Sequence, residues 1–482
     1  MNILFATSEI YPLAKTGGLA DVSGALPAAL RKLGMDVRVL IPGYPKVLAA
    51  LPDKTPLASL ELPVHGALRL HGAAMPDSSV PLIVIEHPGY FDRHGGPYQD
   101  ITGHDWPDNH LRFGLLSAVA ALLGSTASPL HWPVDIVHCN DWQTGLTPAY
   151  LHHGSARPAA TLMTIHNLAY QGIFPPHTLT ELGLPPASFS IEGLEYYGNL
   201  SFLKAGLYYA DHISTVSPSY AEEIQHDALG FGMQGLLQHR RAQLTGIVNG
   251  IDTDDWNPAS DPHLCRHYHP GRMSGKAAVK RLLQAEHGLT RSNDTPLFGV
   301  ISRMTHQKGQ DLLLAIAPQL IEEGVQIMVL GSGDAMLETR LRQLAAEYPA
   351  QVGVVIGYDE GLAHRIEAGA DIFLMPSRFE PCGLNQMYSQ RYGTPPVVRR
   401  TGGLADTVTD TTSASLADGS ATGFMFDEAT PAAFLAAVRR ALACYHNPRQ
   451  WSRIKKNAMA RDFSWETSAR HYQGLYQSML AG

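Results

Sequence analysis

The N-terminal segment, residues 2–44, reads NILFATSEIYPLAKTGGLADVSGALPAALRKLGMDVRVLIPGY, and its pattern predicts the class of the fold. An apolar run at 2–7 is followed by a Gly-Gly loop, a helical pattern at 19–33 and a second apolar run at 35–44 that ends in Pro-Gly. Strand, helix and strand within about forty residues predict a βαβ unit. The chain is therefore expected to begin with a parallel α/β sheet.

The same alternation continues along the whole chain. Further strands are expected in the first half at 82–87, 135–140, 161–166 and 212–217. A second series starts near Gly246, with strands expected at 296–302, 325–331, 352–357, 371–377 and 395–400. Helical stretches separate most of these runs. Such alternation predicts an α/β fold class, with one doubly wound sheet in each half.

The two series predict two Rossmann-like domains in tandem. We expect an N-terminal domain over 1–245 and a C-terminal domain over 246–461, with the boundary near TGIVNGID (245–252). The tail at 462–482 has apolar residues at helical spacing, so we expect a last helix that returns to the first domain.

Composition indicates a globular protein and disfavours two kinds of partner. Hydrophobic residues make up 45% and charged residues 17%, and 36 Lys and Arg against 44 Asp and Glu give a net charge of -8. This charge disfavours nucleic-acid binding and a role on anionic membranes. The four cysteines lack CxxC spacing and no signal-peptide pattern is present, so we expect a reduced, cytoplasmic protein. The oligomeric state stays open.

The hexapeptide TGGLAD occurs twice, at 16–21 and at 401–406. Both copies are expected to follow a strand, where open α/β sheets bind ligands. The first copy continues into a helical pattern, whereas the second continues into β-branched residues. This difference favours one chemical requirement that is met at two places in the chain over a recent duplication of one module. A glycine pair allows close approach of a ligand, but it also allows a tight turn without a ligand. Both interpretations stay open.

Common cofactor and hydrolase motifs are absent from the sequence. The Gly-rich loops match neither Walker A nor GxGxxG, and HExxH, an EF-hand loop and GxSxG are missing. Instead, polar residues stand at predicted strand ends and at the domain boundary: Lys15, Asp141, His166, Asn249, Arg303, Lys308 and Glu380.

Each of these residues alone has an ordinary structural explanation. His166 could be a structural histidine, and Asp141 could cap the N-terminus of a helix. Arg303 and Lys308 could be solvated charges in loops. Together they predict a polar cleft between the domains that suits a nucleotide diphosphate, because Arg and Lys neutralise it and the helix expected after Glu380 offers N–H groups. No DxD-like metal pair stands at these strand ends, and cationic side chains can replace a metal as electrophile.

Eight segments together resemble the bacterial glycogen synthases and plant starch synthases, which are retaining glucosyltransferases of the GT-B fold. The segments are KTGGLADV (15–22), HDWPDN (104–109), NDWQTG (140–145), TIHNLAYQG (164–172), VNGID (248–252), SRMTHQKG (302–309), PSRFEPCGLNQ (376–386) and TGGLADTV (401–408). They follow the family's order and extend over essentially the whole chain. The GT-B fold implies two Rossmann-like domains that face each other across a cleft.

The resemblance implies transfer of glucose from ADP-glucose to the non-reducing end of an α-1,4-glucan such as glycogen, with retention and without a metal or other cofactor. Arg303 and Lys308 would hold the diphosphate, and Tyr358 would stack on adenine. The implied catalytic residues are His166, Arg303, Lys308, Glu380 and Asp141. The implied substrate-binding residues are Lys15, Gly17, Gly18, Tyr98, Asn249, Tyr358, Cys382, Gly383 and Leu384.

Three positions differ from related patterns. Gln143 stands where many relatives have His, Asn385 where they often have Thr, and Tyr388 where the broader clan has a second glutamate that this family lacks.

No carboxylate is an obvious nucleophile by spacing, which favours a same-face route over two displacements. Two alternatives stay open: a GT-B enzyme that uses UDP-glucose, and a non-catalytic two-domain sugar-binding protein.

Overall fold

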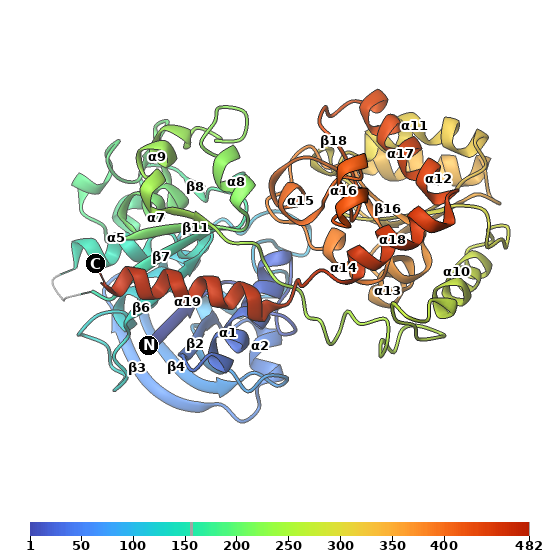
Figure 1. Ribbon diagram of the computed structural model, residues 1–482. Coiled ribbons are helices and arrows are strands. Elements are labelled where there is room, and N and C mark those ends of the chain that lie inside the picture. Colours follow the sequence, from blue (N-terminus) through green and yellow to red (C-terminus); the bar gives the residue numbers. More distant parts are fainter. Residues whose placement is uncertain (155–157, 482) are drawn as a thin grey trace. The chain divides into compact units, whose positions relative to one another are not determined.

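The computed structural model describes residues 1–154 and 158–481, and the chain divides into two compact units (Figure 1). Unit 1 comprises Met1–Gly250 together with Trp465–Gly482, and unit 2 comprises Ile251–Ser464. The predicted fold class is confirmed, since each unit is built on a largely parallel sheet that helices cover.

The sheet of unit 1 has the strand order β12-β11-β7-β6-β1-β2-β5-β4-β3. Within this order, each pair of neighbouring strands from β12 to β5 is parallel. These strands are β1 (Asn2–Ala6), β2 (Asp36–Pro42), β5 (Pro81–Glu86), β6 (Ile136–Asn140), β7 (Ala160–Ile165), β11 (His212–Thr215) and β12 (Leu244–Gly246). β1 is buried almost throughout, which explains its continuous apolar sequence.

An antiparallel ribbon at the edge of this sheet was missing from the sequence prediction. It consists of β3 (Thr55–Leu62) and β4 (Gly66–Ala74), which pair with each other and, through β4, with β5. Residues of β3 are exposed or half-buried, so the ribbon lacks a continuous apolar run. A small antiparallel sheet of β8 (Ile173–Phe174), β10 (Asn199–Ser201) and β9 (Glu195–Tyr196) lies apart from the main sheet.

Helices of unit 1 come from both ends of the chain. They are α1 (Gly18–Lys32), α2 (Pro45–Ala50), α3 (Pro88–Phe91), α4 (Asn109–Leu123), α5 (Thr147–His153), α6 (Thr178–Glu181), α7 (Phe202–Tyr209), α8 (Pro218–Glu223), α9 (Gln234–His239) and α19 (Trp465–Ala481). The last helix, α19, lies along α1 (red and blue in Figure 1). Its Tyr476 hydroxyl bonds to Nδ1 of the buried His138 in β6 at 2.8 Å.

The sheet of unit 2 is parallel throughout, in the order β15-β14-β13-β16-β17-β18. Its strands are β13 (Leu297–Ile301), β14 (Gln326–Gly331), β15 (Val352–Ile356), β16 (Ile372–Met375), β17 (Pro396–Arg399) and β18 (Phe424–Phe426). The helices are α10 (Ser274–Glu286), α11 (Gln310–Glu322), α12 (Ala335–Glu347), α13 (Glu360–Gly369), α14 (Asn385–Arg391), α15 (Gly402–Thr407), α16 (Ser413–Asp418), α17 (Pro431–Tyr445) and α18 (Pro448–Met459).

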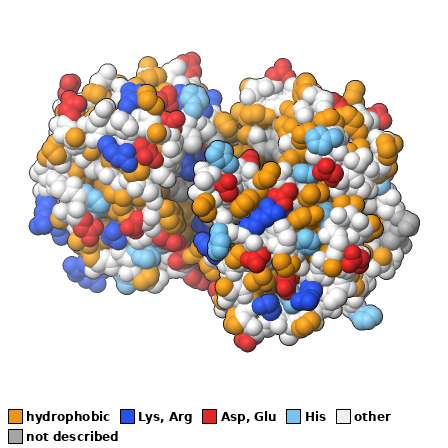
Figure 2. Space-filling model, turned by 180° about the vertical axis from the view of Figure 1, so that it is seen from behind, with side chains coloured by type: hydrophobic (Ala, Val, Ile, Leu, Met, Phe, Trp, Pro, Cys, Tyr) orange, Lys and Arg blue, Asp and Glu red, His pale blue; other side chains and the backbone are white. Residues whose placement is uncertain are grey.

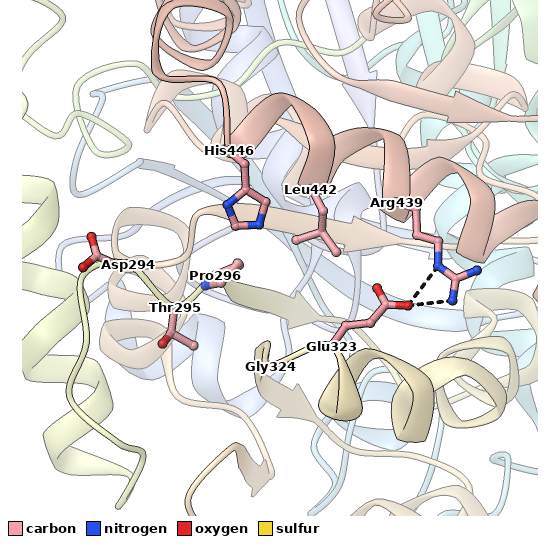
Figure 3. A pocket seen from close by; sticks show the side chains of 8 residues that line it. All are labelled: Asp294, Thr295, Pro296, Glu323, Gly324, Arg439, Leu442 and His446. Carbon is pink, nitrogen blue, oxygen red and sulfur yellow. Dashed lines mark hydrogen bonds and ion pairs between the residues drawn. The ribbon is translucent and has the colours of Figure 1, made fainter.

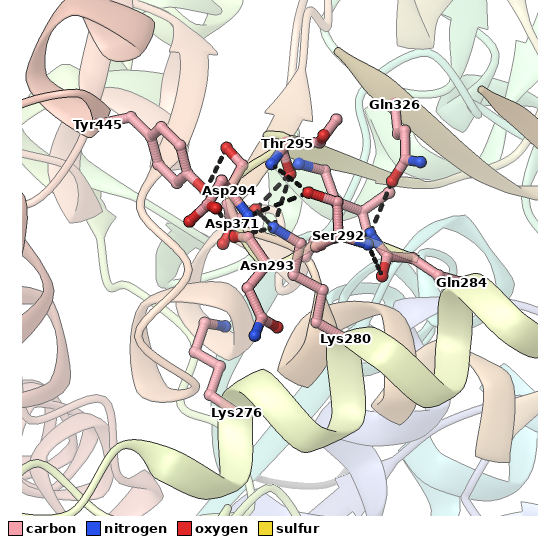
Figure 4. A network of polar contacts seen from close by, with 12 residues as sticks. Lys276, Lys280, Gln284, Ser292, Asn293, Asp294, Thr295, Gln326, Asp371 and Tyr445 are labelled. Atoms are coloured by element: carbon pink, nitrogen blue, oxygen red, sulfur yellow. Dashed lines mark hydrogen bonds and ion pairs between the residues drawn. The ribbon is translucent and has the colours of Figure 1, made fainter. Parts of the chain in front are cut away.

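A buried cation ties α10 to the amino-terminal edge of this sheet (Figure 4). The Lys280 ammonium lies 2.6 Å from the Asp371 carboxylate and donates to the carbonyls of Asn293 at 2.9 Å and Thr295 at 2.6 Å. Asp371 also accepts the Leu297 N–H at 2.9 Å, where β13 begins. The network joins helix and strands at the edge opposite to the predicted site.

The surface carries charges of both signs. On the face shown in Figure 2, Lys and Arg side chains are interspersed with Asp and Glu. Among the described helices, none combines the length and the apolar character that a membrane crossing requires.

Candidate active site

In each unit, predicted site residues follow the strands at which the strand order reverses. In unit 1 the order reverses between β1 and β6, and in unit 2 it reverses between β13 and β16. Open α/β sheets bind ligands beyond the carboxyl ends of the strands at such a point. The two sets of residues are therefore described in turn, beginning with unit 1.

The loop after β1 is organised by the buried carboxylate of Glu9. Its Oε2 accepts the N–H groups of Thr16 and, at 3.1 Å, of Gly17, and its Oε1 accepts the hydroxyl of Tyr98. Tyr98 also bonds to Ser8 Oγ at 2.8 Å. Burial raises the pKa of Glu9, and these hydrogen bonds oppose the shift. Glu9 lies outside the motifs that identified the site, so the sequence prediction missed it.

The first TGGLAD copy leaves space around its glycines. A Cβ added to Gly17 or Gly18 would meet no described atom within 4 Å. Lys15 beside them is partly exposed, and its ammonium lies 2.7 Å from Asp21 and 5.0 Å from the centre of the Tyr11 ring. Packing inside unit 1 does not require glycine at these two positions.

The second TGGLAD copy is packed tightly instead. Gly402 has φ of 42°, and an added Cβ would overlap the carbonyl oxygen of Glu380. A Cβ on Gly403 would overlap the carbonyl of Cys382, and the Gly403 N–H donates to the Glu380 carbonyl at 3.1 Å. The second copy thus supports the loop that carries Glu380, so the two copies have different local roles.

Asp141 and His166 meet at the ends of the neighbouring strands β6 and β7. Asp141 Oδ1 accepts the His166 N–H at 2.8 Å, and the Asp141 N–H donates to the Thr164 carbonyl at 2.9 Å. Asp141 adopts φ of 56° and ψ of -176°, which is strained for a residue with a side chain. Its carboxylate does not cap the following 3-10 helix, Trp142–Thr144. The helix-cap explanation for Asp141 is therefore wrong.

The electrostatics of this pair follow from burial. Burial raises the pKa of Asp141 to about 7, although N–H groups of His166 and Asn167 stabilise the carboxylate. Burial lowers the pKa of His166 to about 3, so its ring is neutral at pH 7. His166 Nε2 faces Asn140 Oδ1 at 2.9 Å, while the Asn140 amide donates to Ala6. Nε2 thus carries the proton and Nδ1 is the acceptor of the neutral ring.

Asn249 lies in the last segment of unit 1 before residue 251. Its side chain is buried, and Oδ1 has no hydrogen-bond partner among the described residues. An unpaired buried acceptor is unfavourable by about 1–3 kcal/mol. The orphan oxygen is therefore consistent with the predicted role of Asn249 in binding a sugar hydroxyl.

In unit 2, Lys308 and Glu380 form a close pair across β13 and β16. The Lys308 ammonium lies 2.5 Å from Glu380 Oε2, which also accepts the Ser377 hydroxyl at 3.0 Å. Both side chains are largely buried, with 15% and 7% exposure. Gly309 follows Lys308 with φ of 69°, and an added Cβ would overlap the Pro376 carbonyl. The two loops are held together by backbone contact that only glycine permits.

The remaining predicted residues of unit 2 follow β13, β15 and β16. Arg303 is exposed after β13, and no hydrogen bond or ion pair of its side chain is seen among the described residues. Tyr358 follows β15 and is 73% exposed. Cys382 is buried and Gly383 has φ of 70°. Leu384 precedes α14.

The differing residue Asn385 has a structural role at the start of α14. Its amide donates to the carbonyl of Ile301, at the end of β13, at 2.9 Å. This bond fixes the start of α14 beside the strand that leads to Arg303. Gln143 is buried, and its Oε1 has no hydrogen-bond partner in the described part of the chain.

One hollow of about 470 Å³ lies elsewhere on unit 2 (Figure 3). Its lining includes Pro296 and Gly324, which stand before β13 and β14, and a pair in which Arg439 donates twice to Glu323 at 2.6 and 2.9 Å. It is thus at the amino-terminal edge of the sheet and contains none of the predicted site residues. Strand topology, rather than concavity, identifies the candidate site.

Family models match most of the chain. A model described as the starch synthase catalytic domain matches residues 2–239, and a model described as glycosyl transferases group 1 matches residues 284–458. The glycogen synthases of Nitrosospira multiformis and Nitrosomonas eutropha are each 57% identical over 484 residues. The matches cover 100% of this chain and 97% and 96% of those proteins.

Solved structures agree with these matches. The catalytic domain of starch synthase IV from Arabidopsis thaliana, bound to ADP and acarbose, has a TM-score of 0.88 and 30% identity, with coverage of 100% of this chain and 99% of that one. Sucrose-phosphate synthase from Thermosynechococcus elongatus, at 19% identity and a TM-score of 0.60, shares the fold, and the match covers 100% of this chain and 99% of that one. The likeness to the starch synthase confirms the predicted two-domain architecture of GT-B type.

Proposed function

This chain belongs to the glycogen and starch synthase family of glycosyltransferases, and we propose that it transfers glucose from ADP-glucose to the non-reducing end of an α-1,4-glucan with retention. The observation that carries the donor assignment is the Lys308–Glu380 pair at the reversal point of unit 2. Relatives named glycogen synthase along the whole chain, and a starch synthase solved with ADP, support it.

In this proposal Lys308 and Arg303 bind the diphosphate of the donor. An ammonium and a guanidinium offset the charge that grows on the leaving phosphate as the bond to glucose breaks. Glu380 holds the Lys308 ammonium, and it would accept from glucose hydroxyls. The exposed ring of Tyr358 would stack on adenine, and the backbone at Cys382, Gly383 and Leu384 would bind phosphate or sugar oxygens.

The residues of unit 1 would bind the transferred glucose. A neutral His166 can hydrogen-bond a sugar hydroxyl, but with a pKa of about 3 it is a poor proton donor at pH 7. Asp141 already accepts N–H groups from His166 and Asn167. We therefore assign Asp141 the role of positioning His166. Lys15, Gly17 and Gly18, Tyr98 and Asn249 would complete the sugar and diphosphate contacts.

The same-face route follows from these assignments. The bond between the glucose C1 and the phosphate oxygen breaks, and the acceptor 4-hydroxyl attacks C1 from the side that the phosphate leaves. The acceptor proton passes to the departing phosphate, so ADP is released and no enzyme carboxylate becomes glycosylated. No metal or other cofactor takes part in this scheme. A glucosyl adduct on Asp141 or Glu380, detected by mass spectrometry during turnover, would contradict it.

The location of the enzyme is proposed to be cytoplasmic. None of the four cysteines, Cys139, Cys265, Cys382 and Cys444, forms a disulfide in the described part of the chain. Free thiols are typical of proteins that work in a reducing compartment.

The test is ADP release from ADP-glucose with and without glycogen, beside a parallel assay with UDP-glucose. We expect glycogen-dependent ADP release and new α-1,4 linkages in the product, with loss of both in Glu380→Ala. Glu428→Gln, an exposed acid of unit 2, is the matched control and should retain full activity. A preference for UDP-glucose would refute the donor assignment, and ADP release that does not depend on glycogen would refute the acceptor assignment.

A further inference from the structure

A cluster of side chains in unit 2, apart from those assigned to glucose transfer, has the composition of a metal site. Asp255, Glu360 and His364 each offer one ligand atom, and these atoms lie within 4.8 Å of one another. Glu360 and His364 are four residues apart in α13, so both project from one face of that helix. Asp255 comes from the irregular segment that precedes α10.

The imidazole of His364 is held in a defined plane. It is fully buried and stacks on the Trp256 ring with centroids 3.8 Å apart and planes 15° apart. Trp256 in turn stacks on Tyr388 at 3.7 Å and 11°. The ring is therefore oriented before any ligand binds.

Hydrogen bonding to the buried Asp261 also fixes the tautomer of His364. Its Nδ1 lies 2.8 Å from Asp261 Oδ2, which accepts the Tyr392 hydroxyl at 2.5 Å, while Asp261 Oδ1 accepts the His263 N–H at 2.8 Å. Oδ2 of Asp261 already acts as an acceptor toward Tyr392, so Nδ1 is the nitrogen that donates to it, and in the neutral ring Nε2 then carries a lone pair.

That second nitrogen is the observation that points to a ligand. Nε2 of His364 is buried and has no hydrogen-bond partner among the described residues. A carboxylate that orients a histidine whose other nitrogen is unpaired is the arrangement found behind metal-binding histidines. Asp255 and Glu360 place two carboxylates close to this histidine, and a cation would offset their mutual repulsion.

We propose that Asp255, Glu360 and His364 bind a divalent cation of the zinc class, with Asp261 as a positioning residue. One imidazole and two carboxylates suit Zn²⁺ and other late first-row ions, whereas Ca²⁺ and Mg²⁺ prefer oxygen ligands alone. Three protein ligands leave a fourth position for water. The ion joins the first turns of α13 to the segment that holds Asp255. It takes no part in the transfer reaction, and the inference stands independently of the proposed function.

The test uses untagged, metal-stripped full-length protein, titrated with Co²⁺ by visible absorption and then with Zn²⁺ in competition. We expect about one ion per chain at this site, and binding at least tenfold weaker in Asp255→Asn and in Glu360→Gln. Glu428→Gln should bind as the parent does. Asp261→Asn, which leaves all three ligands in place, should weaken binding about 10–100-fold.

Thermal unfolding provides a second measurement. A hundredfold excess of Zn²⁺ over its Kd should raise the Tm of the parent by about 5–10 °C, and it should leave Asp255→Asn and Glu360→Gln nearly unchanged. If the parent binds no ion, or if both variants bind as tightly as the parent, the proposal is wrong. The proposal is also wrong if each variant differs from the parent in Tm by the same amount with and without the metal. The three side chains would then interact only with one another and would not bind an ion.

Discussion

Removal of the Lys308 ammonium should damage stability and catalysis separately, and the structure allows the two effects to be resolved. In Lys308→Met, Glu380 stays buried at 7% exposure and retains the Ser377 hydroxyl as a donor at 3.0 Å. Loss of one partner of a buried pair is unfavourable by about 3–5 kcal/mol. Because Ser377 remains, we expect the lower end, about 3 kcal/mol, which corresponds to a fall in Tm of roughly 6–12 °C.

The same substitution removes a positive charge from the leaving diphosphate. Loss of one electrostatic contact of this kind lowers kcat about 10²–10³-fold. The double variant Lys308→Met with Glu380→Gln removes both charges, so most of the stability should return. Its activity should stay at least as low as that of Lys308→Met.

The assays are thermal unfolding and initial rates of ADP release for the parent, both single variants and the double variant. Lys456→Met, which removes an exposed charge from α18, is the control and should match the parent in both. If the double variant regained activity together with stability, Lys308 would act only by neutralising Glu380. If Lys308→Met unfolded at the parent's temperature, the pair would not be buried as described.

Three further predictions concern unit packing and pH. Gly403→Ala should lower Tm strongly, since its Cβ overlaps the Cys382 carbonyl, whereas Gly17→Ala should unfold within about 0.5 kcal/mol of the parent; equal losses in the two would refute the difference between the TGGLAD copies. Tyr476→Phe should cost about 1–3 kcal/mol in chemical denaturation, because it leaves Nδ1 of the buried His138 unpaired; a neutral result would show that α19 does not depend on this bond. Asp141 has a folded pKa of about 7, raised by burial, so its ionisation destabilises the fold as pH rises from about 4 to 7. Asp141→Asn should therefore gain stability relative to the parent between pH 4 and pH 8, by up to about 4 kcal/mol, and a difference that does not vary with pH would refute the raised pKa.

The fold could be predicted because parallel strands that are buried on both faces have continuous apolar sequences. The run at 2–7 became β1, and the helical pattern at 19–33 became α1 (Gly18–Lys32). The β3–β4 ribbon was missed for the converse reason, since its exposed residues interrupt the apolar pattern. Periodicity reports burial, so it detects the core strands better than an edge ribbon.

Part of the candidate site could not be predicted from the sequence, and the reason is a different one. Glu9 and Asn140 act through hydrogen bonds that exist only after two loops or strands come together. Glu9 accepts N–H groups from residues seven and eight positions later, and no spacing rule relates an acid to such a turn. Asn140 begins the NDWQTG motif, but it also lies within a buried strand, and the sequence does not show its hydrogen bond to the His166 ring. In both cases the role depends on hydrogen bonds between segments that only the fold brings together.

The repeated TGGLAD shows why identical residues need not have identical reasons. Gly17 and Gly18 have open space around them, so any requirement for glycine there must have a cause other than the packing of unit 1. Gly402 and Gly403 lie against the backbone of Glu380 and Cys382, so the packing of unit 2 itself requires glycine at these two positions. The second copy still bears on function, because the loop that it supports holds Glu380 against Lys308. A ligand should therefore change the solvent exposure of the first copy directly, whereas it should affect the second copy only through the Glu380 loop.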